Sequence, residues 1–104
     1  MAKTKFSLAA KPTFTAKVAI PVPGEGTADV EFTFKGRTRE QLLSMLESEG
    51  KTWVDVVMDM ASGWELVEPF DAEHVQQLLD NYLGAFQAIQ NTYLKELTAA
   101  RLGN

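Results

Sequence analysis

The residues best suited to catalysis or metal binding lie in one acidic stretch around His74, the only histidine of the chain. Glu68 and Asp71 lie shortly before it, and Glu73 is its neighbour. Carboxylates and imidazoles perform general acid–base catalysis, but a transition-metal site made from them needs further histidine or cysteine ligands. The chain has a single His and no Cys. The stretch therefore predicts an exposed histidine in the first turn of a helix rather than a catalytic or metal centre.

Other short motifs also fall short of a site. None of the serines lies in the G-x-S-x-G context of a nucleophile elbow. The segment Pro23–Gly26 contains G-x-G, but it lacks the third glycine of a dinucleotide site and places a carboxylate where a phosphate would bind. The acidic residues lack the spacing of a calcium loop. We expect no catalytic residue, no cofactor and no metal, and the protein is predicted not to be an enzyme.

Length and composition predict one domain with a real hydrophobic core. The chain has 104 residues, of which 45% are hydrophobic and 10% aromatic. Its net charge of -4 is unfavourable for binding a phosphate backbone, so we expect no nucleic-acid partner. The apolar runs are too short for a signal peptide or a membrane span. We therefore expect a protein that makes no membrane contact and stays in the compartment where it is made.

The first half of the chain alternates between apolar and polar residues with a period of two. The apolar positions of residues 13–22 lie on one face, and Val30, Phe32 and Phe34 resume the alternation after a Pro/Gly loop. Two such strands joined by a turn predict a β-hairpin. An isolated hairpin is only marginally stable in water, so its apolar face must pack against helices or another chain.

Helical patterns follow the hairpin. Thr38 and Gln41 have the spacing of a capping box before a helix at 39–48, and Thr52 precedes a second helix at 53–61, with Ser62-Gly63 as its expected C-cap. Asp71 is the expected N-cap of a third helix, with Phe70 packing on Val75 as a hydrophobic staple. An apolar stripe continues to Leu83, Gly84 marks a bend, and a last helix runs from Ala85 to about Arg101.

The pattern predicts an α+β fold, with an N-terminal β-hairpin followed by about four helices, the last two amphipathic. We expect a single domain, divided into a flexible arm at 1–12, a hairpin at 13–36, two helices at 37–62, a joint at 63–71 and two helices at 72–104. In the joint, Trp64 and Phe70 are expected to be buried between the two halves, with Glu65, Glu68 and Glu73 in solvent.

Eight segments, taken in order, resemble the tail assembly chaperones of long-tailed bacteriophages and of prophages. They are Lys11–Val18, Ile20–Gly26, Val30–Lys35, Arg37–Leu42, Ser62–Glu65, Pro69–Phe70, Leu78–Tyr82 and Tyr93–Arg101. The resemblance extends from about Phe6 to Arg101. It rests on the order and spacing of these segments, because none is a catalytic signature. Leu83 departs from the family, where we expect Pro in many relatives.

The resemblance implies a specific role. Such a protein is made in the host cytoplasm, binds the helical tape-measure protein, keeps it soluble and helps tail-tube subunits to assemble around it, and is absent from the mature virion. Many members also have a longer form, made by a programmed ribosomal frameshift. Codons for Leu102-Gly103-Asn104 allow the slippery heptamer G-GGA-AAC. The partners implied are the tape-measure protein, the tail-tube protein, the frameshifted longer form and, in a homo-oligomer, further copies of the chain.

For the partner contact we expect a helix-in-groove arrangement, because aromatic residues and Met suit recognition of amphipathic helices. The two tryptophans either fill the core or anchor a partner. Fewer than half of the candidate positions are expected to touch the partner, and the rest to form core. The candidates are Trp64, Phe70, Tyr82, Phe86, Ile89, Tyr93 and Leu97.

Two alternatives remain open at this point. The first is a small structural protein of the phage particle, such as a scaffold or a head–tail joining component, which would be present in purified particles. The second is a small enzyme, which would need a titratable pocket around His74.

Overall fold

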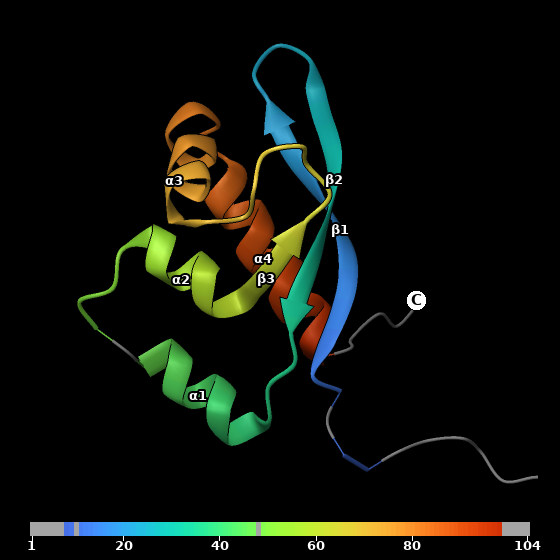
Figure 1. Ribbon diagram of the computed structural model, residues 1–104, viewed down its shortest axis with the longest axis vertical. Coiled ribbons are helices and arrows are strands. Elements are labelled where there is room, and N and C mark those ends of the chain that lie inside the picture. The colour runs from blue at the N-terminus through green and yellow to red at the C-terminus, as the bar shows by residue number, and fades with distance from the viewer. Residues whose placement is uncertain (1–7, 10, 48, 99–104) are drawn as a thin grey trace, which may run out of the picture.

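The computed structural model describes residues 8–9, 11–47 and 49–98, and it confirms the predicted α+β class. An antiparallel sheet with the strand order β1-β2-β3 carries helices on one face (Figure 1). In chain order the elements are β1 (Thr13–Val22), β2 (Gly26–Lys35), α1 (Arg39–Glu47), α2 (Trp53–Met60), β3 (Ala61–Trp64), α3 (Ala72–Asn81) and α4 (Ala85–Thr98).

The predicted hairpin is confirmed, and its register follows from its turn. Val22 pairs with Gly26, and the backbone N–H of Glu25 donates to the carbonyl of Val22 over 2.9 Å. Pro23 occupies the second turn position, where its fixed φ fits, and Gly24 has the positive φ of 80° that the third position of a type II turn requires. This turn places the apolar residues of both strands on the same face.

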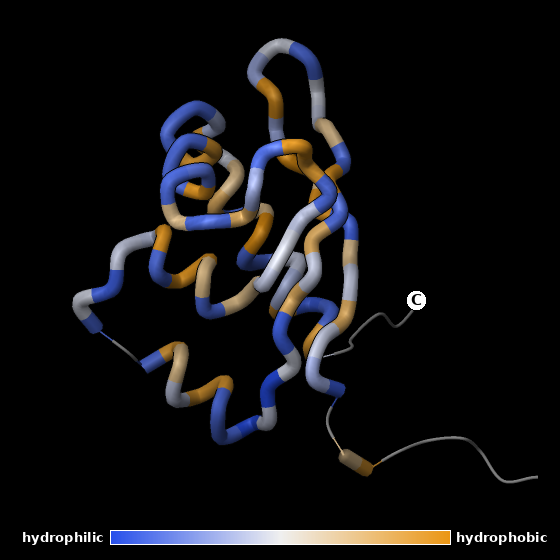
Figure 2. The backbone as a smooth tube through the Cα atoms, viewed as in Figure 1, coloured by the Kyte–Doolittle hydropathy of each residue, from blue (hydrophilic) through white to orange (hydrophobic). Residues whose placement is uncertain are grey.

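The core lies between that face and the helices. α4 packs along β1, while α2 lies against β2 and β3 and also contacts α3. Along the backbone, hydrophobic residues alternate with polar ones in the strands and recur within the helices (Figure 2). The buried core residues are Val18, Ile20, Phe32, Phe34, Val54, Val57, Met60, Ala61, Val75, Leu79, Ala85, Ile89 and Tyr93.

The third strand, β3, was not predicted. Ser62-Gly63 was expected to cap α2, but Ala61 is the C-cap, in an extended conformation, and the chain continues directly into the strand. Trp64 pairs with Phe32 and Gly63 with Thr33, with an irregular register at Thr33/Phe34. A four-residue strand is too short to show a period of two, and Ser-Gly is the usual composition of a turn. Pairing with β2 outweighs that local preference.

The caps predicted for the first two helices are present. Gln41 donates its backbone N–H to Thr38 Oγ1 and accepts from the Thr38 N–H, which completes the capping box of α1. Thr52 forms the corresponding box with Asp55 at the start of α2. The box holds the chain in the conformation that begins a helix because it satisfies backbone donors that have no helical partner.

Three cations surround the last turn of α2. Lys35 donates to the carbonyl of Met58, Arg37 donates to the carbonyl of Asp59, and Lys51 forms an ion pair with the Asp59 carboxylate. Positive groups at a helix C-terminus complement the helix dipole and its free carbonyls. The hairpin end and the loop before α2 are thereby fixed to the same point.

The third helix ends earlier than its apolar stripe predicted. α3 stops at Asn81, and Tyr82 is its C-cap, so Leu83 lies in the turn to α4 and is 79% exposed. The backbone N–H of Ala85 donates to the carbonyl of Tyr82 within this turn. Predictions for the arm at residues 1–7 and 10, for Ser48 and for the end of the last helix at 99–101 lie outside the described residues.

α1 is the least embedded element. None of its residues is buried, although Leu42 and Met45 pack partly against the core. Leu43 and Leu46 are 50% and 47% exposed. Within residues 8–9, 11–47 and 49–98, no helix is long and apolar enough to cross a membrane.

Candidate partner-binding site

Trp64, at the end of β3, anchors the joint between the two halves of the chain. Its ring meets Phe32 edge-on at a centroid distance of 5.8 Å and meets Phe70 edge-on at 5.1 Å. The indole N–H donates to the carbonyl of Glu68 over 2.7 Å, so the polar atom of the ring has a partner. Trp64 and Phe70 were predicted to be buried between the halves. Both pack against the core, but they remain half-buried because the loop covers only part of each ring.

The loop that follows Trp64 is tied to β2 by two hydrogen bonds between the same residues. The backbone N–H of Glu65 donates to the carbonyl of Glu31, and the N–H of Glu31 donates to Glu65 Oε2 over 2.7 Å. Glu65, Glu68 and Glu73 are all exposed, as predicted. The loop backbone is thus fixed while its acidic side chains reach solvent.

His74 lies in the first turn of α3, as predicted, but it is half-buried rather than exposed. Asp71 is the N-cap and accepts the backbone N–H of His74 over 2.9 Å. The same carboxylate oxygen lies 2.8 Å from His74 Nδ1. The backbone hydrogen bond is the main reason why the pKa of Asp71 lies below its ordinary value of 3.8, and the hydrogen bond from the ring adds to it.

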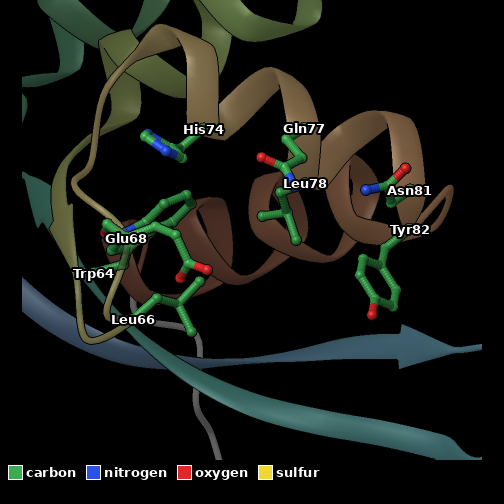
Figure 3. Close-up of a pocket in the computed structure, with 8 residues that line it drawn as sticks. All are labelled: Trp64, Leu66, Glu68, His74, Gln77, Leu78, Asn81 and Tyr82. Atoms are coloured by element: carbon green, nitrogen blue, oxygen red, sulfur yellow. The ribbon is translucent and has the colours of Figure 1, made fainter.

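An open pocket of about 120 Å³ lies between this loop and α3 (Figure 3). Trp64, Leu66 and Glu68 come from the strand and loop side, and the residues opposite come from α3. Tyr82 closes the far end, with its ring directed toward the strands. The complete lining is Trp64, Leu66, Glu68, His74, Gln77, Leu78, Asn81 and Tyr82.

Two of the candidate partner-binding residues are fully buried. Ile89 and Tyr93 have no exposed surface, and the Tyr93 hydroxyl donates to the carbonyl of Lys35 over 2.9 Å. Burial raises the pKa of Tyr93 above 10.0, although the nearby Arg37 opposes that shift. The two side chains pack α4 against the sheet. A partner could contact them only if α4 separated from the sheet.

Three further candidates are half-buried. Phe70 and Leu97 pack against the core, and Phe86 stacks on Trp53 at a centroid distance of 4.5 Å and an interplanar angle of 7°. Trp53 remains 57% exposed in this stack. The structure brings only Trp64 and Tyr82, among the seven candidates, into the lining of the pocket. Whether any of the seven touches a partner stays a prediction.

Sequence reasoning missed the α3 wall of the pocket. His74, Gln77, Leu78 and Asn81 follow the i, i+3, i+4, i+7 spacing of one helix face. That spacing was visible, but three of the four residues are polar and interrupt an apolar stripe. Leu66 gave no signal, because it lies in an irregular loop.

Asp71 and His74 are two titratable side chains of the site that lie in hydrogen-bond contact. Within the described part of the chain, no three His, Cys, Asp or Glu side chains are grouped so that they could hold a metal ion. The pocket combines apolar side chains with polar side chains at its rim, which is the composition of a binding surface.

Comparison with protein families identifies the chain. The phage tail assembly chaperone family matches it over residues 1–104, the whole of its length. The chain belongs to this family. No curated protein and no solved structure matches it. The resemblance found in the sequence is therefore confirmed. Within its described residues, this member of the family has a three-stranded sheet, four helices and a pocket at the joint between its halves.

Proposed function

We propose that the protein is a non-catalytic tail assembly chaperone that binds the tape-measure protein of its phage, keeps it soluble, and promotes assembly of the tail tube around it. It acts in the host cytoplasm and is not retained in the mature particle. The proposal includes two further partners, the tail-tube protein and additional copies of the chain.

The observation that carries this proposal is the family match over residues 1–104. A tape-measure protein is long and helical in the phages that the resemblance points to, so before the tube forms its apolar helix faces lack a partner. A holdase must offer apolar groups to such faces while its own charge keeps the complex in solution.

The described surface has both properties. Leu43 and Leu46 on α1 and Trp53 on α2 expose about half of their surfaces, and Tyr82 exposes 37%. The chain has 14 acidic and 10 basic side chains, which leaves it with a net negative charge. Exposed apolar groups on a charged body support a binding role over a catalytic one.

Co-expression with the tape-measure protein of the same phage tests the proposal. We expect the tape-measure protein to aggregate when it is made alone, and to become soluble and co-purify with the tagged chaperone when both are made. An unrelated acidic protein of similar size is the control. The proposal fails if the tape-measure protein is equally insoluble with either protein.

Purified phage particles distinguish the chaperone from the structural alternative. Mass spectrometry should detect tail-tube and tape-measure peptides but none from this chain. Stoichiometric amounts of the chain in particles would instead favour a scaffold or joining component.

The frameshifted longer form is a separate part of the proposal. The gene sequence tests it directly: a slippery heptamer over the codons for residues 102–104 and an overlapping open frame are expected. Without both features, this part of the proposal is rejected and the binding role is unaffected.

A further inference from the structure

The pocket at the joint has a rim of polar side chains that the rest of the described chain does not use. The carboxylate of Glu68 and the amides of Gln77 and Asn81 make no hydrogen bond with another described residue. On the neighbouring face of α3 the situation differs, because the Gln76 amide donates to Asp80. The rim groups are therefore free to bind a ligand at no cost in internal hydrogen bonds.

The pocket lining also contains half-buried apolar side chains, those of Trp64, Leu66 and Leu78. Its volume of about 120 Å³ suits one aliphatic side chain. Two strongly exposed apolar residues adjoin the lining in sequence: Val67, which is 99% exposed, and Leu83, which is 79% exposed. Both residues leave a large apolar side chain in solvent next to a lining residue in the sequence.

The segment that surrounds the pocket carries only acidic charged residues. Residues 52–94 supply the joint, α2, α3 and most of α4, and they contain no Lys or Arg. The same segment carries half of the acidic residues of the protein: Asp55, Asp59, Glu65, Glu68, Asp71, Glu73 and Asp80. All ten Lys and Arg lie outside it in the sequence. In the structure, Lys35, Arg37 and Lys51 meet the segment at the last turn of α2, where Lys51 pairs with Asp59. A partner that carries positive charge beside an apolar side chain complements this surface.

The length of the pocket wall indicates the form of the partner. His74 and Asn81 are seven residues apart on α3, which corresponds to about 10 Å along the helix axis. A partner helix presents residues i, i+3, i+4 and i+7 over the same distance. Glu73 stands one helical turn before Gln77, so an acidic side chain also lies beside the start of this wall.

We propose that the pocket at the joint receives an apolar side chain of a basic amphipathic helix, whose Lys or Arg residues pair with Glu68 and Glu73. This inference rests on the proposed function, since it places the contact with the tape-measure protein at this pocket. Trp64 and Leu78 contact the inserted side chain, and Gln77 and Asn81 donate or accept hydrogen bonds at the rim.

Fluorescence titration of Trp64 tests the inference with defined probes. Trp53→Phe leaves Trp64 as the single tryptophan and keeps an aromatic ring on Phe86. The first probe is a helical peptide of about 14 residues with Leu along one face and Lys beside it, long enough to span the wall. The second has Glu in place of Lys, and the third is residues 1–10 of this chain, which contain Lys3, Lys5, Phe6 and Leu8.

The Lys peptide is expected to shift the Trp64 emission and the Glu peptide to leave it unchanged. In the same background, Glu68→Lys with Glu73→Lys should weaken binding of the Lys peptide about tenfold. Glu25→Lys with Asp29→Lys is the matched control, because it makes the same change in net charge at exposed positions of the hairpin. That control should change the affinity no more than about twofold. Equal weakening by both pairs, or equal binding of the Lys and Glu peptides, would overturn the inference.

Tighter binding of the 1–10 peptide than of the Lys peptide would also overturn the inference, because the pocket would then bind the N-terminal arm of the chain itself. Co-expression separates this inference from the proposed function. If the variant with Glu68→Lys and Glu73→Lys still keeps the tape-measure protein soluble, the pocket assignment fails while the chaperone role stands. If the unmodified protein does not keep it soluble, the chaperone role fails whatever the peptides show.

Discussion

Gly84 lies directly against the ring of Pro21: a Cβ atom added at Gly84 would come within 2.8 Å of Pro21 Cγ and 3.2 Å of its Cβ. Gly84 is in the turn between α3 and α4, and Pro21 is near the end of β1. The contact packs the turn against β1 and thereby fixes the position at which α4 begins on the sheet. Only hydrogen in place of a side chain allows this approach.

We predict that Gly84→Ala lowers the free energy of unfolding by about 1–3 kcal/mol, the usual cost of overpacking. Its φ is not positive, so steric contact with Pro21 is the cause. Pro21→Ala in the same chain should recover most of the loss, and urea denaturation of the double-mutant cycle measures that coupling. Gly63→Ala is the control, because its Cβ would meet Thr33 at an ordinary 3.9 Å. Additive effects of the two substitutions would contradict the steric explanation.

Sequence patterns predicted the parts of the fold that depend on local chemistry. The hairpin, the capping boxes at Thr38 and Thr52, and the N-cap at Asp71 all follow from residues close together in the chain. β3 could not be predicted in this way, since four residues show no period and their strand conformation depends on pairing with Phe32, Thr33 and Phe34. The close approach of Gly84 to Pro21 is likewise invisible without the tertiary structure.

The candidate site was only partly predictable for the same reason. An amphipathic stripe shows which residues share a helix face, but it does not show whether the sheet or a partner covers that face. Ile89 and Tyr93 share a stripe with Phe86, and the sheet buries the first two completely while leaving Phe86 half-buried. Consequently the substitution Tyr93→Asp would test folding, whereas the substitutions Glu68→Lys and Glu73→Lys test partner binding.

The stack of Trp53 on Phe86 should stabilise the contact between α2 and α4. We predict a coupling energy of about 0.5–1.5 kcal/mol between Trp53→Ala and Phe86→Ala, the range for a well-formed aromatic pair. Denaturation of the two single variants and the double variant gives this value. Leu43→Ala paired with Phe86→Ala is the control, because Leu43 is about as exposed as Trp53 but lies on α1. Coupling of the control pair equal to that of Trp53 and Phe86 would show that the stack has no specific effect.

The Asp71 cap makes the stability of α3 dependent on pH. The pKa of Asp71 is lower in the folded protein than its ordinary value of 3.8, so its contribution is present above pH 3.8 and is lost as pH falls through the folded-state pKa. Asp71→Asn keeps a capping side chain without a charge, whereas Asp71→Ala removes the cap. We expect Asp71→Ala to lower the melting temperature by a few degrees at pH 7 and Asp71→Asn to lower it less.

Thermal denaturation between pH 2 and pH 7 checks this assignment. The difference in melting temperature between the unmodified protein and Asp71→Asn should shrink as pH falls below 3.8. A difference that stays constant over this range would show that the charge of Asp71 does not contribute.

Tyr93 should produce the opposite dependence at alkaline pH. Because burial raises its pKa above 10.0, the folded state favours the protonated hydroxyl, which donates to the carbonyl of Lys35. The stability from this group is complete below pH 10.0 and is lost as pH rises through the raised folded-state pKa. Tyr93→Phe removes the hydrogen bond and should cost about 1–3 kcal/mol at pH 7, since a buried carbonyl loses its donor.

Ultraviolet titration of phenolate formation, with circular dichroism on the same samples, measures this effect. The chain has two tyrosines, so Tyr82→Phe leaves Tyr93 as the only titrating phenol. In that variant we expect phenolate to appear only above pH 10 and together with loss of helical signal, because ionisation of Tyr93 breaks the contact between α4 and the end of β2. Tyr93→Phe has no phenol to ionise at this position. Between pH 7 and alkaline pH it should therefore lose a smaller share of its stability, and its helical signal should persist to higher pH. Ionisation of Tyr93 below pH 10, or without any loss of structure, would contradict its buried, hydrogen-bonded position.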